Sequence, residues 1–245
     1  MYANVGTIHL KKGTSGVLLL GILSALMAMT SLSVDIYLPA MPKMQQALQG
    51  DVELTITGFL IGFSIAQIFW GPVSDKYGRR KPLFIGLSLF IVGSVGCAMS
   101  QTMTEIVFWR VIQALGACTG PMLSRAMIRD MYGQTKAAEM LSTLMIVMAI
   151  APIAGPLIGG QILVVSDWHS IFWLLAVIGV LLFFASHALP ETLPEERKNK
   201  EGLWSAFSKY GLLVKNRNFM IYTLCVTFFL YGCLCIYRRF AIGVY

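Results

Sequence analysis

The sequence has little charge for its length. Asp, Glu, Lys and Arg make up 13% of its 245 residues, whereas a typical soluble domain contains roughly 25%. Hydrophobic residues make up 56%, and the mean hydropathy is +0.70. One soluble core could not bury this much apolar surface, so lipid must surround part of the protein. The composition excludes an ordinary soluble domain and predicts a polytopic helical membrane protein.

The sequence also lacks the residue patterns that carry catalysis or metal binding. It contains no hydrolytic triad, no phosphate-binding glycine loop and no cluster of metal ligands. Its five cysteines lie in apolar segments, and Cys233 and Cys235 are one residue apart, whereas a redox pair has two residues between its cysteines. We therefore expect no enzymatic activity, no metal and no other cofactor, and the cysteines to be small packing residues.

Most of the basic residues lie in one set of loops. The net charge is +7, which could suggest nucleic-acid binding, but the charge distribution fits the orientation rule for membrane proteins better. One set of segments contains Lys11, Lys12, Lys76, Arg79, Arg80, Lys81, Arg125, Arg129, Lys136 and the basic residues from Arg197 to Arg217, while the opposite loops before the last apolar stretch contain only Lys43. We expect a cytoplasmic N-terminus and no nucleic-acid partner.

Apolar stretches near the length of a bilayer span, about 20 residues, divide the chain. They are Val17–Tyr37, Thr55–Trp70, Leu83–Ser100, Glu105–Leu123, Ala138–Val164, Ser170–Leu189 and Phe219–Tyr237. This pattern predicts an all-α membrane bundle with a cytoplasmic N-terminus (1–16), a six-helix unit (17–189), a central cytoplasmic loop (190–217) and a seventh span with a short tail (218–245). The first stretch is too long for a signal peptide and lacks a clear cleavage site.

Two features near the end of the chain are unusual. Apolar and aromatic residues between Leu203 and Leu213 suggest a short interfacial helix in the central loop, or only a solvated linker with one amphipathic turn. Arg238 and Arg239 follow the seventh span on the side where the charge rule disfavours them. We expect the chain to be an interrupted form of a longer protein.

The stretch between the second and third spans fits the pattern G-x-x-x-D-x-x-G-R-R. Gly71 and Gly78 permit a tight turn or close helix contact. Asp75 could accept backbone N–H groups at a helix N-terminus, and Arg79 and Arg80 could anchor the turn to an anionic membrane surface. We predict that this stretch is a tight basic turn with a specific role, because a generic basic turn would not require the full spacing.

Arg110 and Asp35 are candidates for proton coupling. A cation inside a span is costly and usually faces a cavity or a partner, although Arg110 could instead extend to the outer surface. The alternating orientation of the spans puts both residues in the outer part of the membrane. A carboxylate near a fixed cation could bind and release protons. Asp35 could equally cap the first extracellular turn, and the sequence leaves these two roles open.

The fifth span contains two prolines and several small residues. Pro152 and Pro156 remove helix hydrogen bonds, while Gly155, Gly159 and the adjacent Gly160 favour close helix packing. This combination predicts a bent gating helix. Three other polar or aromatic residues, Tyr37, Gln67 and Gln113, are candidates for a substrate cavity; a bond to a neighbouring helix is the commoner role for a glutamine within a span.

Several of these patterns resemble signatures of the major facilitator superfamily. Gly71–Lys81 resembles its loop between spans two and three. Arg110-x-x-Gln113-Ala114-x-Gly116 resembles its span-four signature, with Ala114 where glycine is usual. Ala151–Gly160 resembles its span-five antiporter signature, with Ala151 in place of the first glycine. With Asp35–Pro42, Arg125-x-x-x-Arg129-Asp130 and Leu189-Pro190-Glu191-Thr192, the sequence is similar to the bicyclomycin/chloramphenicol-resistance branch of the drug:proton antiporters.

The resemblance implies twelve spans in two halves that rock about a central solute cavity. It implies a monomeric transporter of the bacterial inner membrane that exports small amphipathic drugs in exchange for protons. Asp35 would then carry the proton and Arg110 would tune it. The stretch with Gly71, Asp75, Gly78, Arg79 and Arg80 would be a cytoplasmic gating loop, in which Asp75 and Arg79 contact a late helix of the second half. Two alternatives remain open, a membrane fragment that transports nothing and a proton symporter for small metabolites.

Overall fold

The computed structural model describes residues 16–197, 210–211 and 215–228. The chain divides into two units, Met1–Lys198 and Asn199–Tyr245. In the second unit, residues 217–228 are helical, and they cover the first part of the expected seventh span. The expected cytoplasmic N-terminus up to residue 15, the interfacial helix apart from residues 210 and 211, and the end of the chain with Arg238 and Arg239 lie outside the described residues.

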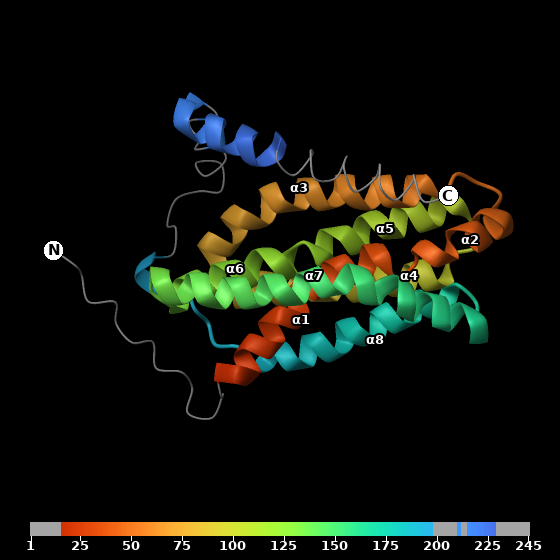
Figure 1. The fold of residues 1–245 in the computed structure, drawn as a ribbon, viewed down its shortest axis with the longest axis horizontal. Coiled ribbons are helices and arrows are strands. Elements are labelled where there is room, and N and C mark those ends of the chain that lie inside the picture. Colours follow the sequence, from red (N-terminus) through yellow and green to blue (C-terminus); the bar gives the residue numbers. More distant parts are fainter. Residues whose placement is uncertain (1–15, 198–209, 212–214, 229–245) are drawn as a thin grey trace. The chain divides into compact units, whose positions relative to one another are not determined.

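The first unit is a bundle of helices (Figure 1), and none of its described residues forms a strand. The long helices are α1 (Gly16–Asp35), α3 (Glu53–Tyr77), α4 (Arg80–Met99), α5 (Met103–Ala117), α6 (Thr119–Met131), α7 (Gln134–Val165) and α8 (His169–Ala185). Shorter elements are η1 (Leu38–Ala40), α2 (Met41–Leu48), η2 (Ser186–Ala188) and η3 (Glu195–Arg197). Six helical stretches within this part of the chain are long and apolar enough to span a membrane, which confirms the predicted all-α membrane bundle.

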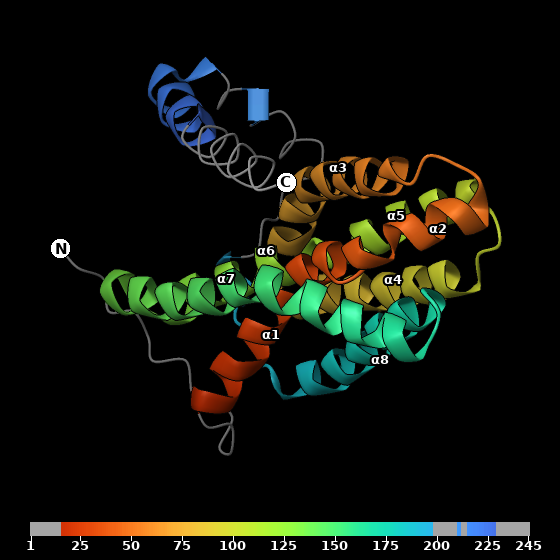
Figure 2. The same cartoon turned by 45° about the vertical axis from the view of Figure 1, so that its right-hand side comes forward.

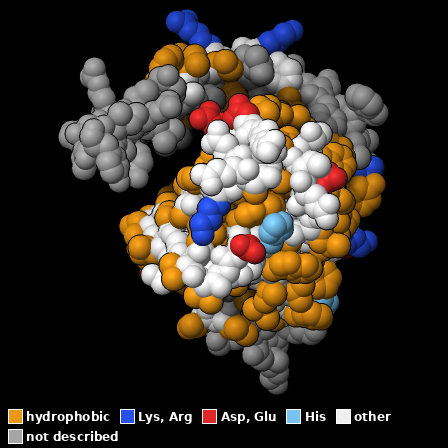
Figure 3. Space-filling view, turned by 90° about the vertical axis from the view of Figure 1, so that its right-hand side faces the viewer, with side chains coloured by type: hydrophobic (Ala, Val, Ile, Leu, Met, Phe, Trp, Pro, Cys, Tyr) orange, Lys and Arg blue, Asp and Glu red, His pale blue; other side chains and the backbone are white. Residues whose placement is uncertain are grey.

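The spans pack mainly on their immediate neighbours in the bundle. Helix α4 lies between α5 and α8, α3 packs on α5, and α1 packs on α6 and α7 (Figure 2). Their shared core includes Leu26, Phe90, Ile106 and Phe172, all fully buried. One end of the bundle carries α2 and the loops with few basic residues. Figure 3 faces this end, where hydrophobic side chains and white surface surround a few charged and histidine side chains near the middle.

The predicted fourth span is two helices in sequence, α5 and α6, which meet at Cys118. Pro121 explains the break, because proline has no N–H to donate to the carbonyl of Ala117 four residues earlier. The Thr30 hydroxyl on α1 donates to that carbonyl instead, at 2.9 Å. The break therefore leaves no unsatisfied acceptor at Ala117 and adds a polar contact between α1 and the fourth span.

The predicted basic turn at residues 71–82 is mostly helical, so the sequence interpretation was wrong in extent. Helix α3 continues through Pro72 to Tyr77, α4 begins at Arg80, and only Gly78 and Arg79 lie between them. Within these last turns the Ser74 hydroxyl donates to the Gly71 carbonyl at 2.9 Å. Gly71 and Asp75 therefore belong to the last turns of a span.

Candidate functional site

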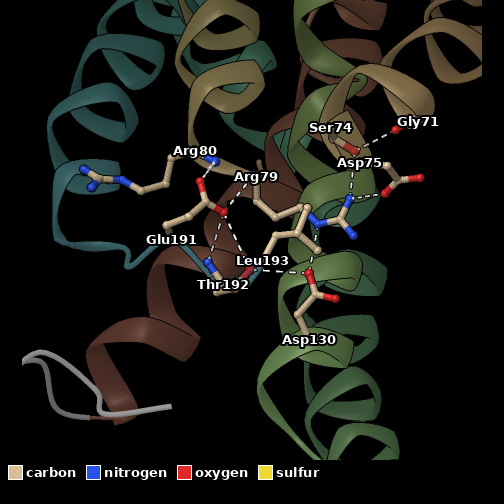
Figure 4. A network of polar contacts seen from close by, with 9 residues as sticks. All are labelled: Gly71, Ser74, Asp75, Arg79, Arg80, Asp130, Glu191, Thr192 and Leu193. Carbon is tan, nitrogen blue, oxygen red and sulfur yellow. Dashed lines mark hydrogen bonds and ion pairs between the residues drawn. The ribbon is translucent and has the colours of Figure 1, made fainter. Parts of the chain in front are cut away.

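Arg79 is the centre of a charged network at the end of the bundle where α3, α6 and α8 finish (Figure 4). Its Nε donates to Asp130 Oδ2 at 2.8 Å, and its Nη1 donates to Asp75 Oδ1 at 2.7 Å and to Ser74 Oγ at 2.8 Å. Burial alone would lower the pKa of Arg79, but the hydrogen bonds and negative charges of Asp130 and Asp75 outweigh it and raise that pKa. The network joins α3 and α6 across the short turn.

Glu191, just after α8, caps the start of α4. Its Oε1 accepts the backbone N–H of Arg79 at 2.8 Å, and its Oε2 accepts that of Arg80 at 3.1 Å. A carboxylate at this position also faces the positive end of the helix dipole. The sequence interpretation gave this capping role to Asp75, which was wrong. Asp75 lies on the preceding helix and pairs with Arg79 instead.

The turn between α3 and α4 requires glycine at position 78. Its φ is +90°, a backbone conformation that side-chain-bearing residues rarely adopt. A Cβ at this position would also lie 2.6 Å from Glu191 Oε2. The glycine of the sequence pattern therefore serves both the turn geometry and the approach of the capping carboxylate.

The polar contacts of Arg110 all lie in the bundle interior. The side chain of Arg110 is fully buried. Its Nη1 donates to the Ser33 carbonyl on α1 at 3.0 Å and to Gln113 Oε1 at 2.7 Å, and Gln113 Nε2 donates to Ser94 Oγ on α4 at 2.7 Å. This chain of hydrogen bonds links α1, α5 and α4. The possibility that Arg110 extends to the outer surface does not agree with its burial.

Three aromatic rings surround the Arg110 guanidinium. Its Cζ lies 4.2 Å from the ring centroid of Tyr37, 4.5 Å from that of Phe59 and 5.9 Å from that of Phe172. The Arg110 Nε and Nη2 have no hydrogen-bond partner among the described residues, so these ring faces form their surroundings. Cation–π contacts are strongest at such desolvated sites. We call Tyr37, Phe59 and Phe172 the aromatic cage.

Asp35 lies at the C-terminal end of α1, where α7 packs against it. It is half-buried, and a Cβ at Gly155 on α7 would lie 3.0 Å from the Asp35 Cβ. A Cβ at Gly159 would collide with the carbonyl oxygen of Ile36, while one at Gly160 would meet nothing within 4 Å. Among the described residues, no ion pair joins Asp35 to Arg110. Arg110 instead holds the carbonyl of Ser33, two residues earlier on the same helix.

The other predicted site residues are separated by the fold. Tyr37 and Gln113 are fully buried beside Arg110, whereas Gln67 is exposed on α3. Pro152 and Pro156 lie inside α7, which continues without interruption from Gln134 to Val165. The predicted bend of this helix and the substrate-cavity role of the three side chains stay predictions.

Sequence reasoning missed several residues of these two clusters. Asp130 and Glu191 occur in the patterns that carried the family resemblance, yet no role was assigned to them. The cage residues Phe59 and Phe172, and Ser94 beyond Gln113, are apolar or small residues within spans. No sequence signal distinguishes them from ordinary core residues, because only the packing of α3, α4 and α8 brings them to Arg110.

Six membrane-length helices with a buried cation and a charged joint at one end define a polytopic helical membrane protein. The described residues contain no group of three or more potential metal ligands. The family model of the Major Facilitator Superfamily matches residues 22–240. The chain therefore belongs to the Major Facilitator Superfamily, a family of membrane transporters.

Several curated relatives carry names of drug-resistance proteins. An uncharacterized MFS-type transporter, YdgK, of Bacillus subtilis is 37% identical over 90% of this chain and 56% of its own length. A chloramphenicol resistance protein of Pseudomonas aeruginosa is 34% identical over 83% of this chain and 49% of its own length. The multidrug resistance protein D of Escherichia coli is 28% identical over 84% and 52%, respectively. The chain spans about half the length of the curated relatives it matches.

Solved structures support the same fold. The proton:xylose symporter XylE superposes with a TM-score of 0.65 at 16% identity, over 72% of this chain and 45% of the symporter. The human organic anion transporter MFSD10 superposes with a TM-score of 0.60 at 20% identity, over 76% and 50%. The first unit therefore has the fold of one half of a major facilitator transporter.

Proposed function

We propose that this chain is the N-terminal half of a proton-coupled multidrug exporter of the bacterial inner membrane, with its N-terminus in the cytoplasm. The names of the relatives from Pseudomonas aeruginosa and Escherichia coli support drugs as the substrate class. The basic residues gather at the end of the bundle that carries Arg79 and Arg80, which favours a cytoplasmic position for that end. Small amphipathic drugs and protons would be the transported partners.

The observation that carries this proposal is the contact between Asp35 and the glycine face of α7. A half-buried carboxylate that no hydrogen bond or ion pair engages among the described residues is free to exchange a proton. A Cβ built at Gly155 on α7 would lie 3.0 Å from the Asp35 Cβ, so movement of α7 would change the surroundings of Asp35. Arg110 fixes the backbone of α1 two residues earlier and so positions Asp35.

In the proposed cycle, the Asp35 carboxylate takes up a proton from the outer side and releases it to the cytoplasm. Drug would leave toward the outside in the opposite half of the cycle. The charged joint of Arg79, Asp75 and Asp130 would close the cytoplasmic side. This cycle requires a cavity between two halves of a transporter. The described residues of the first unit would form one of these halves.

Flux in proteoliposomes tests the proposal. Two proteins are reconstituted, the 245-residue chain alone and residues 16–217 of this chain joined to the second half of the Pseudomonas aeruginosa chloramphenicol resistance protein. We expect the joined protein to transport chloramphenicol only when a proton gradient is present. A protonophore should abolish this flux, and Asp35→Asn should lower it at least tenfold. The matched control is Asp167→Asn, which removes an exposed carboxylate and should leave flux unchanged.

Three outcomes would contradict the proposal. If neither protein moves the drug, the half is no transport module. If flux ignores the protonophore, coupling to protons is wrong. If Asp35→Asn and Asp167→Asn behave alike, Asp35 is not the proton site. Proton uptake driven by sugars or small metabolites in place of drugs would favour a symporter.

A further inference from the structure

A continuous apolar groove runs along the outside of the six-span unit between α4 and α8. One hollow of about 300 Å³ is lined by Ser88, Val92 and Phe184, among others, and a second of about 240 Å³ by Val95, Trp173 and Val177, among others. Ile91 and Val180 line both hollows, so the two form one groove. We call this surface the α4–α8 groove.

Basic side chains lie about two helical turns before this groove along α4, whose lining begins at Ser88. Arg80 begins α4, and Lys81 beside it is exposed. The Arg80 guanidinium lies 5.7 Å from the ring centroid of Phe84, and its Nη2 reaches the His187 carbonyl only at 3.5 Å. Its Nε is buried and has no hydrogen-bond partner among the residues that the structure describes. In Figure 4 the Arg80 side chain extends away from Arg79 toward α8.

The nearer hollow of the groove lies at the depth of one leaflet of a bilayer. From Arg80 to Ile91 the helix rises by about 16 Å at 1.5 Å per residue. Half of the hydrocarbon core of a bilayer measures about 15 Å. A molecule whose headgroup lies at Arg80 and Lys81 would therefore reach the bilayer midplane near Ile91 and Val180, which line both hollows.

We propose that the α4–α8 groove is a binding site for an anionic phospholipid of the leaflet that contains Arg80. Its phosphate would accept hydrogen bonds from the Arg80 guanidinium and the Lys81 ammonium, and one acyl chain would lie in the groove. The charge complementarity favours an anionic headgroup over a zwitterionic one, because each basic residue near the membrane surface strengthens binding of anionic lipid. The site lies wholly within the first unit, so it does not depend on the proposed transport activity.

Native mass spectrometry of the purified, delipidated 245-residue chain tests this site. The probes are phosphatidylglycerol and phosphatidylcholine with identical acyl chains. We expect one tightly retained phosphatidylglycerol and weaker binding of phosphatidylcholine. Lys81→Gln should weaken phosphatidylglycerol binding about fivefold, whereas Lys136→Gln, which removes an exposed lysine on α7, should leave it unchanged.

A second pair of variants tests the acyl-chain part of the site. Val180→Phe fills the position shared by both hollows and should lower the binding of both lipids. Ile146→Phe, on the 62%-exposed position of α7, is the matched control. Equal binding of the two lipids to the unmodified chain, or no effect of Lys81→Gln or Val180→Phe beyond its control, would overturn the proposal.

Photolabelling avoids any loss of folding in the variants. Phosphatidylglycerol with a diazirine near the end of one acyl chain is bound to the unmodified chain and irradiated. We expect labelled peptides from the segments around Ile91 and Val180. Labelling spread evenly over the exposed apolar residues of α3 and α7 would show only a general lipid coat and would overturn a specific site.

Discussion

Glu191 and Arg80, 111 residues apart in the chain, meet where the Glu191 Oε2 accepts the Arg80 backbone N–H at 3.1 Å. The same carboxylate accepts the N–H groups of Arg79, Thr192 and Leu193 through its Oε1. The Glu191 side chain thus links the segment that follows the sixth span to the first residues of α4. Arg79 takes part in both sets of contacts. Its backbone N–H donates to Glu191, and its side chain donates to Asp75 and Asp130, so the charged network depends on the cap by Glu191.

Gly78→Ala should weaken this joint. The substitution places a Cβ at a φ of +90° and 2.6 Å from Glu191 Oε2, so we expect a loss of about 1–3 kcal/mol in the free energy of unfolding. Denaturant titration in detergent, followed by circular dichroism, measures the loss. Gly133→Ala is the control, since a Cβ there meets nothing within 4 Å. Equal midpoints for the two variants would show that the turn tolerates a side chain.

Asp130→Asn should destabilise the protein more than Asp75→Asn. Both carboxylates pair with Arg79, but the Asp130 side chain is 14% exposed and the Asp75 side chain is 55% exposed. Removing the charge from a buried pair costs about 3 kcal/mol, whereas an exposed pair contributes about 1 kcal/mol or less. The unfolding midpoints of the two variants give the comparison. The reverse order would mean that Asp75 is the principal partner of Arg79.

Tyr37→Phe and Tyr37→Leu separate the hydroxyl of this cage residue from its ring. The Tyr37 hydroxyl and Thr55 Oγ1 are 3.2 Å apart, and its loss should cost about 1 kcal/mol. Tyr37→Leu also removes a ring 4.2 Å from the Arg110 Cζ, a desolvated cation–π contact that contributes about 2 kcal/mol. The thermal unfolding midpoint of Tyr37→Leu should therefore be well below that of Tyr37→Phe. Similar values would mean that the ring face does not stabilise Arg110.

Gly159→Ala and Gly160→Ala should behave differently although the two positions are adjacent. A Cβ at Gly159 collides with the Ile36 carbonyl, while a Cβ at Gly160 meets nothing within 4 Å. We expect a loss of about 1–3 kcal/mol for the first and no loss, or a gain of up to about 1 kcal/mol, for the second. Chemical unfolding of both variants checks this. A shared effect would indicate that α7 does not pack on α1 through Gly159.

The spans were predictable from sequence because lipid imposes a strong constraint on composition. An apolar run near 20 residues has few alternatives to a helix, and six of the predicted runs correspond to membrane-length helices of the first unit. These features depend on local sequence.

The remaining features depend on contacts between segments distant in sequence. The run from Gly71 to Tyr77 is polar enough to suggest a loop, yet it continues α3 because Ser74 and Arg79 satisfy its polar groups. The cap by Glu191 and the cage around Arg110 join residues more than 50 positions apart. No local pattern encodes which aromatic residues will meet a buried cation.

The buried hydrogen bonds and cation–π contacts among the described residues connect five of the six spans of the bundle. Through Arg110, its hydrogen bonds and its aromatic cage, the spans that contain α1, α3, α4, α5 and α8 are tied together. Helix α7 has no such tie within the described residues: its end meets other elements only through the exposed pairs of Lys43 with Leu163 and Ser166 with Ser170. A displacement of α7 along α1 would therefore break no buried hydrogen bond, while the other five spans could move only as a block.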